Sequence, residues 1–114
     1  MTPIYKICTA AEWREAERDG AYRGSAVDLK DGFIHFSAAE QVFETASKWF
    51  AGQRDLVLVA VDADSLGEKL KWEPSRGGAL FPHLYGELPL KAVQRVDALP
   101  LDETGQHVFP RFYC

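Results

Sequence analysis

The feature that most constrains the fold is an uninterrupted apolar run at residues 56–61, Leu-Val-Leu-Val-Ala-Val. Its β-branched content favours a strand, and it is too short for a convincing helix. A strand with apolar side chains on both sides must be covered on both faces. The run therefore predicts the central strand of a sheet with other elements packed above and below it.

Further strands are expected around this run. Residues 4–8 and 33–36 are short segments rich in apolar residues, residues 70–73 read as a strand stopped by Pro74, and residues 92–99 alternate, as is typical of strands. Residues 79–85 contain a proline that a central strand would not tolerate, so they are expected to form an edge strand or an extended segment. A polar loop with a brief strand or turn is expected at residues 20–32, and an irregular tail at residues 102–114.

A first helix is indicated by a capping box. Thr9 and Glu12 fit the pattern Thr-x-x-Glu, in which each side chain accepts a hydrogen bond from the other residue's backbone. The helix should end at Gly20, because glycine closes helices in the left-handed conformation. Its buried face is expected to include Trp13 and Ala16.

A second helix is predicted by the same signal at Ser37 and Glu40. The apolar residues behind it recur at steps of three and four, which indicates one buried stripe. This stripe comprises Ala39, Val42, Phe43, Ala46, Trp49 and Phe50, and Gly52 is expected to close the helix.

The order of these elements predicts an α+β protein with two main helices. Helices and strands interleave early in the chain, but the later strands follow one another without helices between them. That order favours α+β over a doubly wound parallel sheet. The length of 114 residues is typical of one domain, and no linker or low-complexity tract interrupts it. Residues 1–114 are therefore expected to form a single domain.

Composition excludes several functional classes. The net charge is −4, and the 13 basic residues are scattered rather than clustered. We therefore expect no stable binding to nucleic acid and none to anionic membranes. With no apolar run of about 20 residues and no signal-type start, the expected location is the cytoplasm. A monomer is expected, because the sequence shows no helical seam or large apolar stripe.

Motifs for metal binding or nucleophilic catalysis are missing from the sequence. Cys8 and Cys114 lie at opposite ends of the chain, outside any Cys-x-x-Cys pair, and are expected to be free thiols. A zinc site built from His35, His83 and Cys8 would lack standard ligand spacing, so no metal is expected. The chain contains no Gly-x-Ser-x-Gly, P-loop or Gly-x-Gly-x-x-Gly sequence.

His35 lies within the segment GFIHFS. Histidine is the side chain most easily adapted to acid–base work near neutral pH. On a strand, His35 points away from the face used by Ile34 and Phe36, and so toward a cleft or solvent. The alternative is a structural histidine that is hydrogen-bonded to the backbone.

His83 lies within the segment FPHLYG. Pro82 and Gly86 make this segment stiff and irregular, and functional sites are often built on such loops. The alternative is that these two residues only shape a turn. The two histidines are the candidate catalytic residues.

Several polar and aromatic side chains near these segments are candidate ligand-binding residues. Ser37 and the amide groups of the helix expected behind it could form a small anion site. Arg76, beside two glycines, is suited to a phosphate or carboxylate, although the simpler interpretation is an ordinary surface loop. The remaining candidates on this basis are Tyr22, Arg23, Trp72, Glu73 and Tyr85.

The chain also resembles a known family. The segments IYKI, DGFIHFS-x-x-x-Q, LVLVAVD, KWE and LFPHLYGELPL are similar to the bacterial family catalogued as domain of unknown function 952. That family is similar in fold to the ADP-ribosyltransferases and to the RNA 2′-phosphotransferases that use NAD. The resemblance implies an ADP-ribosyltransferase-like, mostly antiparallel split sheet. It also implies that Lys6, His35 and Glu87 take the transferases' three site positions.

Three functions follow as hypotheses. The first is a binding module that holds a small anionic or nucleotide-like ligand, for example NAD or an ADP-ribose-like molecule. Lysine and histidine differ from the residues that the transferases have at the first two positions, and this difference favours ligand binding in the cleft over catalysis of the transfer reaction. The second is a diverged NAD-dependent transferase or a hydrolase, in which His35 contacts the leaving group and His83 acts as general base. A protein-interaction domain is a third alternative.

Overall fold

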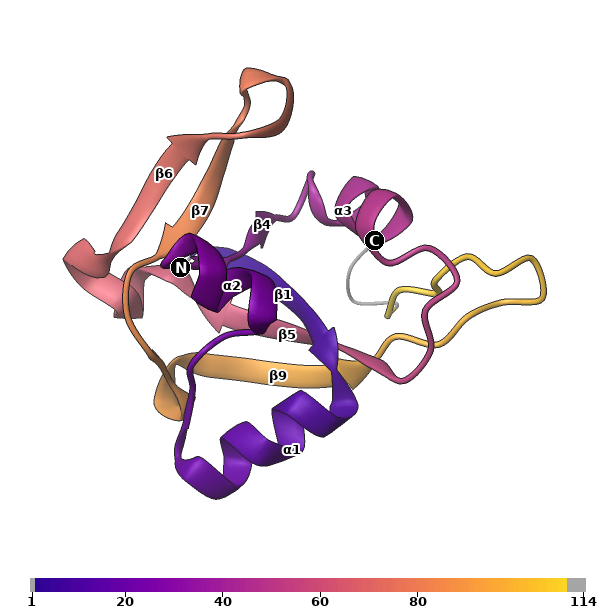
Figure 1. Ribbon diagram of the computed structural model, residues 1–114, viewed down its shortest axis with the longest axis horizontal. Helices are drawn as coiled ribbons and strands as arrows, with labels where there is room; N and C mark the ends of the chain where they lie inside the picture. The colour runs from indigo at the N-terminus through magenta and orange to yellow at the C-terminus, as the bar shows by residue number, and fades with distance from the viewer. Residues whose placement is uncertain (1, 111–114) are drawn as a thin grey trace.

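A four-stranded antiparallel sheet forms the centre of the molecule (Figure 1). The computed structural model describes residues 2–110, except for the side chain of Arg76. The strand order is β4-β1-β5-β9, and each neighbouring pair is antiparallel. The predicted α+β class with antiparallel pairing is confirmed. These strands are β1 (Pro3–Thr9), β4 (Ser37–Ala38), β5 (Leu56–Asp62) and β9 (Val93–Ala98).

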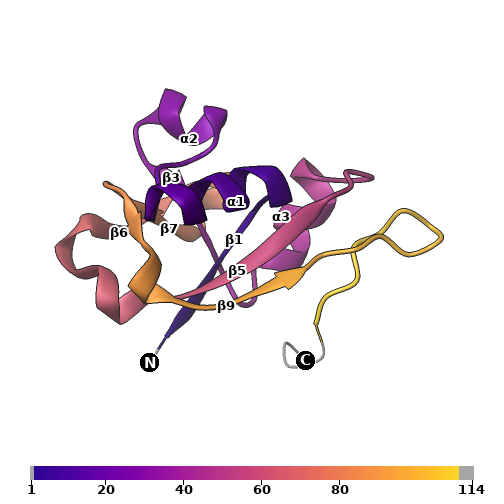
Figure 2. The ribbon, with the colours of Figure 1, turned by 90° about the horizontal axis from the view of Figure 1, so that it is seen from below.

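Strand β5 is covered on both faces, as its apolar sequence predicts. Val59 and Val61 are fully buried in one cluster with Trp13 of helix α1 (Ala10–Asp19). Helix α1 packs against β1 and β5 (Figure 2). The alternate residues of β5, including Leu58, are buried in a second cluster with helix α3 (Val42–Trp49). The two helices therefore cover opposite faces, because successive side chains of a strand point to opposite sides.

Helix α1 begins with the predicted capping box. The Thr9 hydroxyl accepts from the Glu12 backbone N–H at 3.0 Å, and the Glu12 carboxylate accepts from the Thr9 N–H at 3.0 Å. Gly20 ends the helix in the left-handed conformation, with φ +87°. Trp13 and Ala16 are buried, so this helix is confirmed from start to end.

A second capping box starts a short helix, α2 (Ala26–Asp31), where the sequence predicts a loop. Ser25 accepts from the Asp28 backbone N–H at 3.4 Å, and the Asp28 carboxylate accepts from the Ser25 N–H at 2.9 Å. The signal is less clear in the sequence because aspartate stands where capping boxes usually have glutamate or glutamine. The brief strand expected in this region is β2 (Ala21–Tyr22).

Helix α3 begins later than predicted. Ser37 pairs with Tyr5 as part of β4, and its hydroxyl is hydrogen-bonded to the Thr45 hydroxyl at 2.8 Å. The N-cap of α3 is Gln41, whose side chain makes no capping bond. The predicted Ser37 cap is therefore wrong, because sheet pairing takes up the backbone at that position. The anion site expected at Ser37 loses its helix N-terminus.

The predicted apolar stripe of α3 is only partly buried. Val42 and Ala46 face the sheet, whereas Phe43 and Trp49 are 49% and 63% exposed. Phe43 lies about 100° around the helix from Val42, so a narrow contact face does not include it.

A three-stranded antiparallel sheet carries both histidine segments, in the order β3 (Ile34–His35), β7 (Leu80–Leu84) and β6 (Leu70–Pro74). Strands β6 and β7 form a hairpin that extends away from the four-stranded sheet (Figure 1). Because β7 is the middle strand, the predicted edge position is wrong. Pro82 is tolerated because β3 ends at His35, and the Pro82 carbonyl instead accepts from the Phe36 N–H at 3.0 Å.

The remaining elements are short. Strand β2 pairs with β8 (Leu88–Pro89) in a two-stranded sheet. Three 3₁₀ segments, η1 (Ala63–Lys69), η2 (Arg76–Gly78) and η3 (Leu90–Ala92), connect the later strands. Within residues 2–110, no helix is both long and apolar enough to span a membrane.

Candidate functional site

The two candidate catalytic histidines lie directly opposite each other. His35 on β3 and His83 on β7 are partners in the antiparallel register, so their side chains share one face of the sheet. Their ring centroids are 5.6 Å apart with an edge-on geometry. The structure therefore brings together two residues that lie 48 positions apart in the chain (83 − 35).

An aromatic cluster surrounds this pair. Phe33 lies two residues before His35 and stacks on the His83 ring with a centroid distance of 4.1 Å. Its ring is also 4.6 Å from His35 and 5.2 Å from Tyr85. Phe33 is half-buried, whereas His83 beneath it is only 5% exposed. Of the two histidines, His35 is therefore the one that solvent reaches more easily.

Asp28 connects His35 to the core, and the sequence offered only its Ser-x-x-Asp spacing as a signal. Its carboxylate accepts from His35 at both the backbone N–H (3.1 Å) and Nδ1 (2.6 Å). It also pairs with the Lys6 ammonium at 2.8 and 3.0 Å. Burial raises the pKa of the Asp28 carboxyl, but the His35 hydrogen bond and the Lys6 charge outweigh it and hold that pKa well below its usual range.

Lys6 reaches Asp28 because the side chains of β1 point alternately to the two faces of the central sheet. Ile4, Lys6 and Cys8 point to the same face of the central sheet, where α2 lies above them, and Lys6 is 6% exposed. The Lys6 ammonium is therefore engaged by the Asp28 carboxylate. The Cys8 thiol beside it is also buried, and burial raises its pKa to about 12, so it is not an activated nucleophile.

A second carboxylate holds His35 from the solvent side. The Nε2 atom of His35 lies 2.9 Å from the carboxylate of Asp31, at the end of α2. His35 is thus anchored at both ring nitrogens by one short helix. Any ligand that takes a proton from His35 Nε2 must displace Asp31, whose side chain is 44% exposed.

His83 has its own carboxylate partner. Its Nδ1 lies 2.8 Å from Glu73 Oε1, and the Tyr85 hydroxyl donates to the same oxygen at 2.8 Å. These two hydrogen bonds lower the pKa of Glu73, and the bond to Glu73 raises the pKa of Tyr85. Three of the predicted site residues therefore form one chain of contacts.

A cleft of about 260 Å³ opens beside Phe33. Its walls come from α2, from the residues around β3 and from the turn after β7. Two predicted ligand-binding residues, Arg23 and Glu87, line it and form an ion pair, with Arg23 Nε 2.7 Å from Glu87 Oε2. The lining comprises Arg23, Asp28, Leu29, Gly32, Phe33, Ile34, Gly86 and Glu87.

Among the predicted site residues with described side chains, only Arg23 and Glu87 line this cleft; the others, namely Lys6, Tyr22, His35, Ser37, Trp72, Glu73, His83 and Tyr85, are not part of its lining. Tyr22 is 3% exposed and packs on Trp13 in the core. Ser37 is 4% exposed and bonded to Thr45. The position predicted for Arg76 falls at the tip of the β6–β7 hairpin, and its side chain lies outside the described part of the chain.

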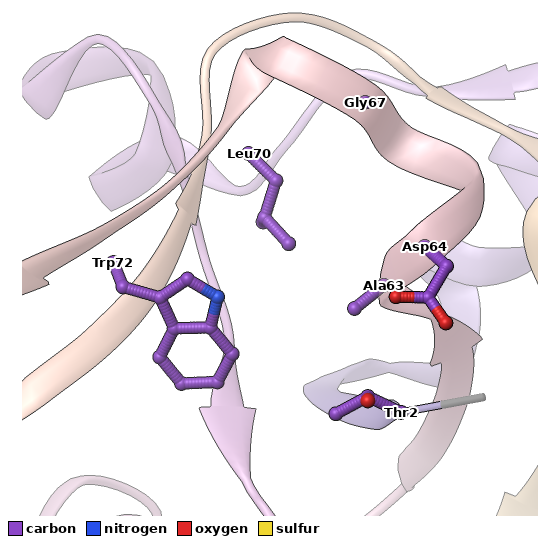
Figure 3. Close-up of a pocket in the computed structure, with 6 residues that line it drawn as sticks. All are labelled: Thr2, Ala63, Asp64, Gly67, Leu70 and Trp72. Atoms are coloured by element: carbon purple, nitrogen blue, oxygen red, sulfur yellow. The ribbon is translucent and has the colours of Figure 1, made fainter.

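Trp72 lies on the opposite face of the three-stranded sheet from His83. It pairs with Pro82 rather than with His83, and neighbouring residues of a strand point to opposite sides. Its indole borders a separate cavity of about 330 Å³, which Figure 3 shows between Trp72, Leu70 and Asp64. The candidate ligand-binding residue Trp72 therefore does not share a face of the sheet with His83.

The described residues, 2–110, contain no group of three or more His, Cys, Asp or Glu side chains arranged to hold a metal ion. The polar groups of the site are instead joined in carboxylate–histidine pairs. Such pairs orient a ring and fix which nitrogen carries a proton.

Comparison with known proteins gives a family and three similar structures. A family model described as "Protein of unknown function (DUF952)" matches residues 7–96. The crystal structure of protein CC0527 from Caulobacter crescentus is 59% identical, with 94% of each chain covered and a TM-score of 0.91. A crystal structure of a double mutant of that protein is 57% identical, with the same coverage and a TM-score of 0.90. Its solution NMR structure is 60% identical over 93% of this chain and 91% of that one, with a TM-score of 0.83. No curated protein matches the chain.

Proposed function

The chain belongs to the DUF952 family, and on that premise we propose that it binds a small anionic or nucleotide-like ligand in the cleft beside Phe33. The main support is that the cleft joins an aromatic ring and a guanidinium group within one set of walls. Both histidine segments contribute, GFIHFS through Gly32, Phe33 and Ile34, and FPHLYG through Gly86.

Phe33 would contact a flat ring of the ligand. It is half-buried, and its partners His83 and Tyr85 hold it in place from the protein side. Stacking between a base and an aromatic side chain contributes about 1–3 kcal/mol in nucleic-acid complexes. Leu29, 68% exposed on α2, adds an apolar edge to the same cleft.

Arg23 would hold the anionic group. A guanidinium binds a phosphate or carboxylate through two parallel hydrogen bonds. A second cation lies nearby, because the Lys69 ammonium is 3.6 Å from the position that a Cβ would occupy on Gly86. The carboxylate of Asp28, which also lines the cleft, is paired with the Lys6 ammonium and hydrogen-bonded by His35, so it opposes an anion less than an unpaired carboxylate would.

The size of the cleft limits the ligand. Drug-sized ligands usually occupy pockets of about 300–1,000 Å³, so about 260 Å³ suits one ring with a sugar or phosphate better than a whole dinucleotide. A fragment such as nicotinamide, or one half of ADP-ribose, would fit, with the remainder lying outside.

The likeness to an ADP-ribosyltransferase scaffold is part of this proposal. Lys6 on β1 and His35 on β3 take the first two positions that the resemblance implies, and both contact the Asp28 carboxylate. Residues of two strands that are distant in the sequence therefore contact one carboxylate, which supports this part of the proposal. The contact through Asp28 gives Lys6 a structural part in holding His35, and this supports binding rather than transfer.

The alternative is an enzyme that uses His35 and His83 as acid and base. One observation favours it, because each histidine has its Nδ1 fixed by a carboxylate, an arrangement that prepares Nε2 for proton transfer. In that case a ligand would displace Asp31 from His35 Nε2, and Phe33 would have to move for His83 to take part.

A thermal-shift and NMR screen tests the proposal, with NAD, ADP-ribose, nicotinamide and inorganic pyrophosphate as probes. We expect stabilisation by ADP-ribose that is lost in Arg23→Gln and in Phe33→Ala. Because Phe33→Ala can also loosen the fold, its unfolding temperature without ligand is the reference. The absence of any shift with all four probes would refute the proposal. Turnover of NAD that disappears in His35→Ala would instead establish the alternative.

A further inference from the structure

The backbone places Arg23 and Glu87 opposite each other. Strands β2 and β8 pair Ala21 with Pro89 and Tyr22 with Leu88. The next antiparallel positions outward are 23 and 87, so the two residues stand opposite each other just beyond the last pair. Their side chains meet at 2.7 Å, and both residues line the cleft.

Glu87 has no competing bond among the described residues. Within that part of the chain, Arg23 is the only hydrogen-bond partner of its side chain, whereas Arg23 also contacts Asp19 at 3.3 Å. Both members of the pair are exposed, by 53% at Arg23 and 58% at Glu87. Exposed ion pairs of this kind add little to stability, so the Glu87 carboxylate can leave Arg23 at small cost.

From this arrangement we infer that Glu87 is an internal competitor for the anion-binding site on Arg23. The inference depends on the proposed function, since it gives Glu87 the place that the anionic group of the ligand would take. The Glu87 carboxylate lies against the Arg23 guanidinium, where the anionic group of a ligand would bind, and it lines the same cleft as Phe33. Binding through Arg23 Nε therefore requires the anionic group of the ligand to replace the Glu87 carboxylate.

This competitor selects the class of ligand. A tethered group acts at an effective concentration in the millimolar range. A ligand with a single carboxylate offers Arg23 the same chemistry as Glu87 and gains little by replacing it. A phosphate carries up to two negative charges and three acceptor oxygens, and can also interact with Lys69 near Gly86. The cleft should therefore prefer phosphate or pyrophosphate groups over carboxylates.

The test compares Glu87→Gln, Arg23→Gln and the wild type by NMR titration with inorganic pyrophosphate, ADP-ribose and acetate. The Glu87→Gln change keeps the size of the side chain and removes its charge. We expect it to tighten pyrophosphate and ADP-ribose binding by about three- to fivefold, the gain from breaking an exposed ion pair. Arg23→Gln should abolish both, and acetate should bind the wild type far more weakly than pyrophosphate.

Glu44→Gln is the matched control. Glu44 is an exposed carboxylate paired with Lys48 on α3, outside the cleft lining. Its substitution changes the net charge equally and should leave the affinities unchanged. Equal tightening in Glu44→Gln and Glu87→Gln would show a general charge effect and overturn the inference.

The remaining outcomes separate this inference from the proposed function. Binding that Arg23→Gln abolishes and Glu87→Gln leaves unchanged would overturn the competitor role while the binding function stands. Weaker ADP-ribose binding in Glu87→Gln, with pyrophosphate binding unaffected, would mean that Glu87 contacts the ribose, and this result would also overturn the competitor role. If Glu87→Gln binds pyrophosphate and ADP-ribose and the wild type does not, the competitor role is strongly supported. No binding by any variant would refute the function and the inference together.

Discussion

The buried pair between Lys6 and Asp28 gives the sharpest stability prediction. In Lys6→Met the side chain keeps its length but loses its charge, and Asp28 remains 1% exposed. Removing one partner of a buried ion pair costs about 3–5 kcal/mol. Asp28 keeps its bonds from His35 and from the Ser25 N–H, so we expect the lower end, about 3 kcal/mol. At about 4 °C per kcal/mol for a chain of this size, the unfolding temperature should fall by about 12 °C.

Urea unfolding followed by tryptophan fluorescence measures this loss. The matched control is Lys48→Met, which breaks the exposed contact between Lys48 and Glu44 at 3.9 Å and should cost under about 0.5 kcal/mol. A loss of less than about 1 kcal/mol in Lys6→Met, or equal losses in the two variants, would show that Asp28 does not depend on Lys6.

Three further predictions follow from the same contacts. The folded chain keeps Asp28 ionised to lower pH than the unfolded chain does, so its contribution to stability is complete above the ordinary carboxyl pKa and is lost as the pH falls below about 4. In urea unfolding between pH 2 and 6, the free energy of unfolding should therefore fall less steeply with decreasing pH in Asp28→Asn than in the wild type. An unchanged dependence on pH would contradict this role. In Gly24→Ala the new Cβ would lie 2.7 Å from the Asp28 Cβ at φ +114°, so this variant should lose about 2 kcal/mol more in urea unfolding than Gly105→Ala, where φ is +87° and no atom lies within 4 Å. Equal losses would mean that the backbone at Gly24 relaxes. Trp72→Ala should leave ADP-ribose affinity unchanged in a calorimetric titration, because Trp72 lies on the far face of its sheet, and a marked loss of affinity would place the ligand there instead.

Local signals in the sequence predicted the parts of the fold that depend on near neighbours. The apolar run of β5 specifies a strand with two covered faces, and the Thr9 capping box specifies where α1 begins. Both depend on residues within one element. The failure at Ser37 shows the limit of such signals, because the pairing of Ser37 with Tyr5 involves a strand 32 positions away (37 − 5) and overrides a good local cap.

The candidate site depended more on distant pairing. The role of Asp28 arises only when α2 lies over β1, which brings Lys6 within 2.8 Å across 22 positions of the chain. No spacing in the sequence reports that contact. The position of Trp72 could have been predicted, however. Trp72 and Glu73 are neighbours on one strand, so they could not both face His83.

The central claim is that the cleft beside Phe33 binds an anionic, ring-containing ligand through Arg23. An NMR titration of the isotope-labelled chain with ADP-ribose tests it most directly, read at the Arg23 Nε–H and at the backbone amides of Gly32, Phe33, Gly86 and Glu87. Saturable shifts are expected at these positions and should disappear in Arg23→Gln. Saturable shifts confined to the cavity beside Trp72, or no shifts at all, would contradict it.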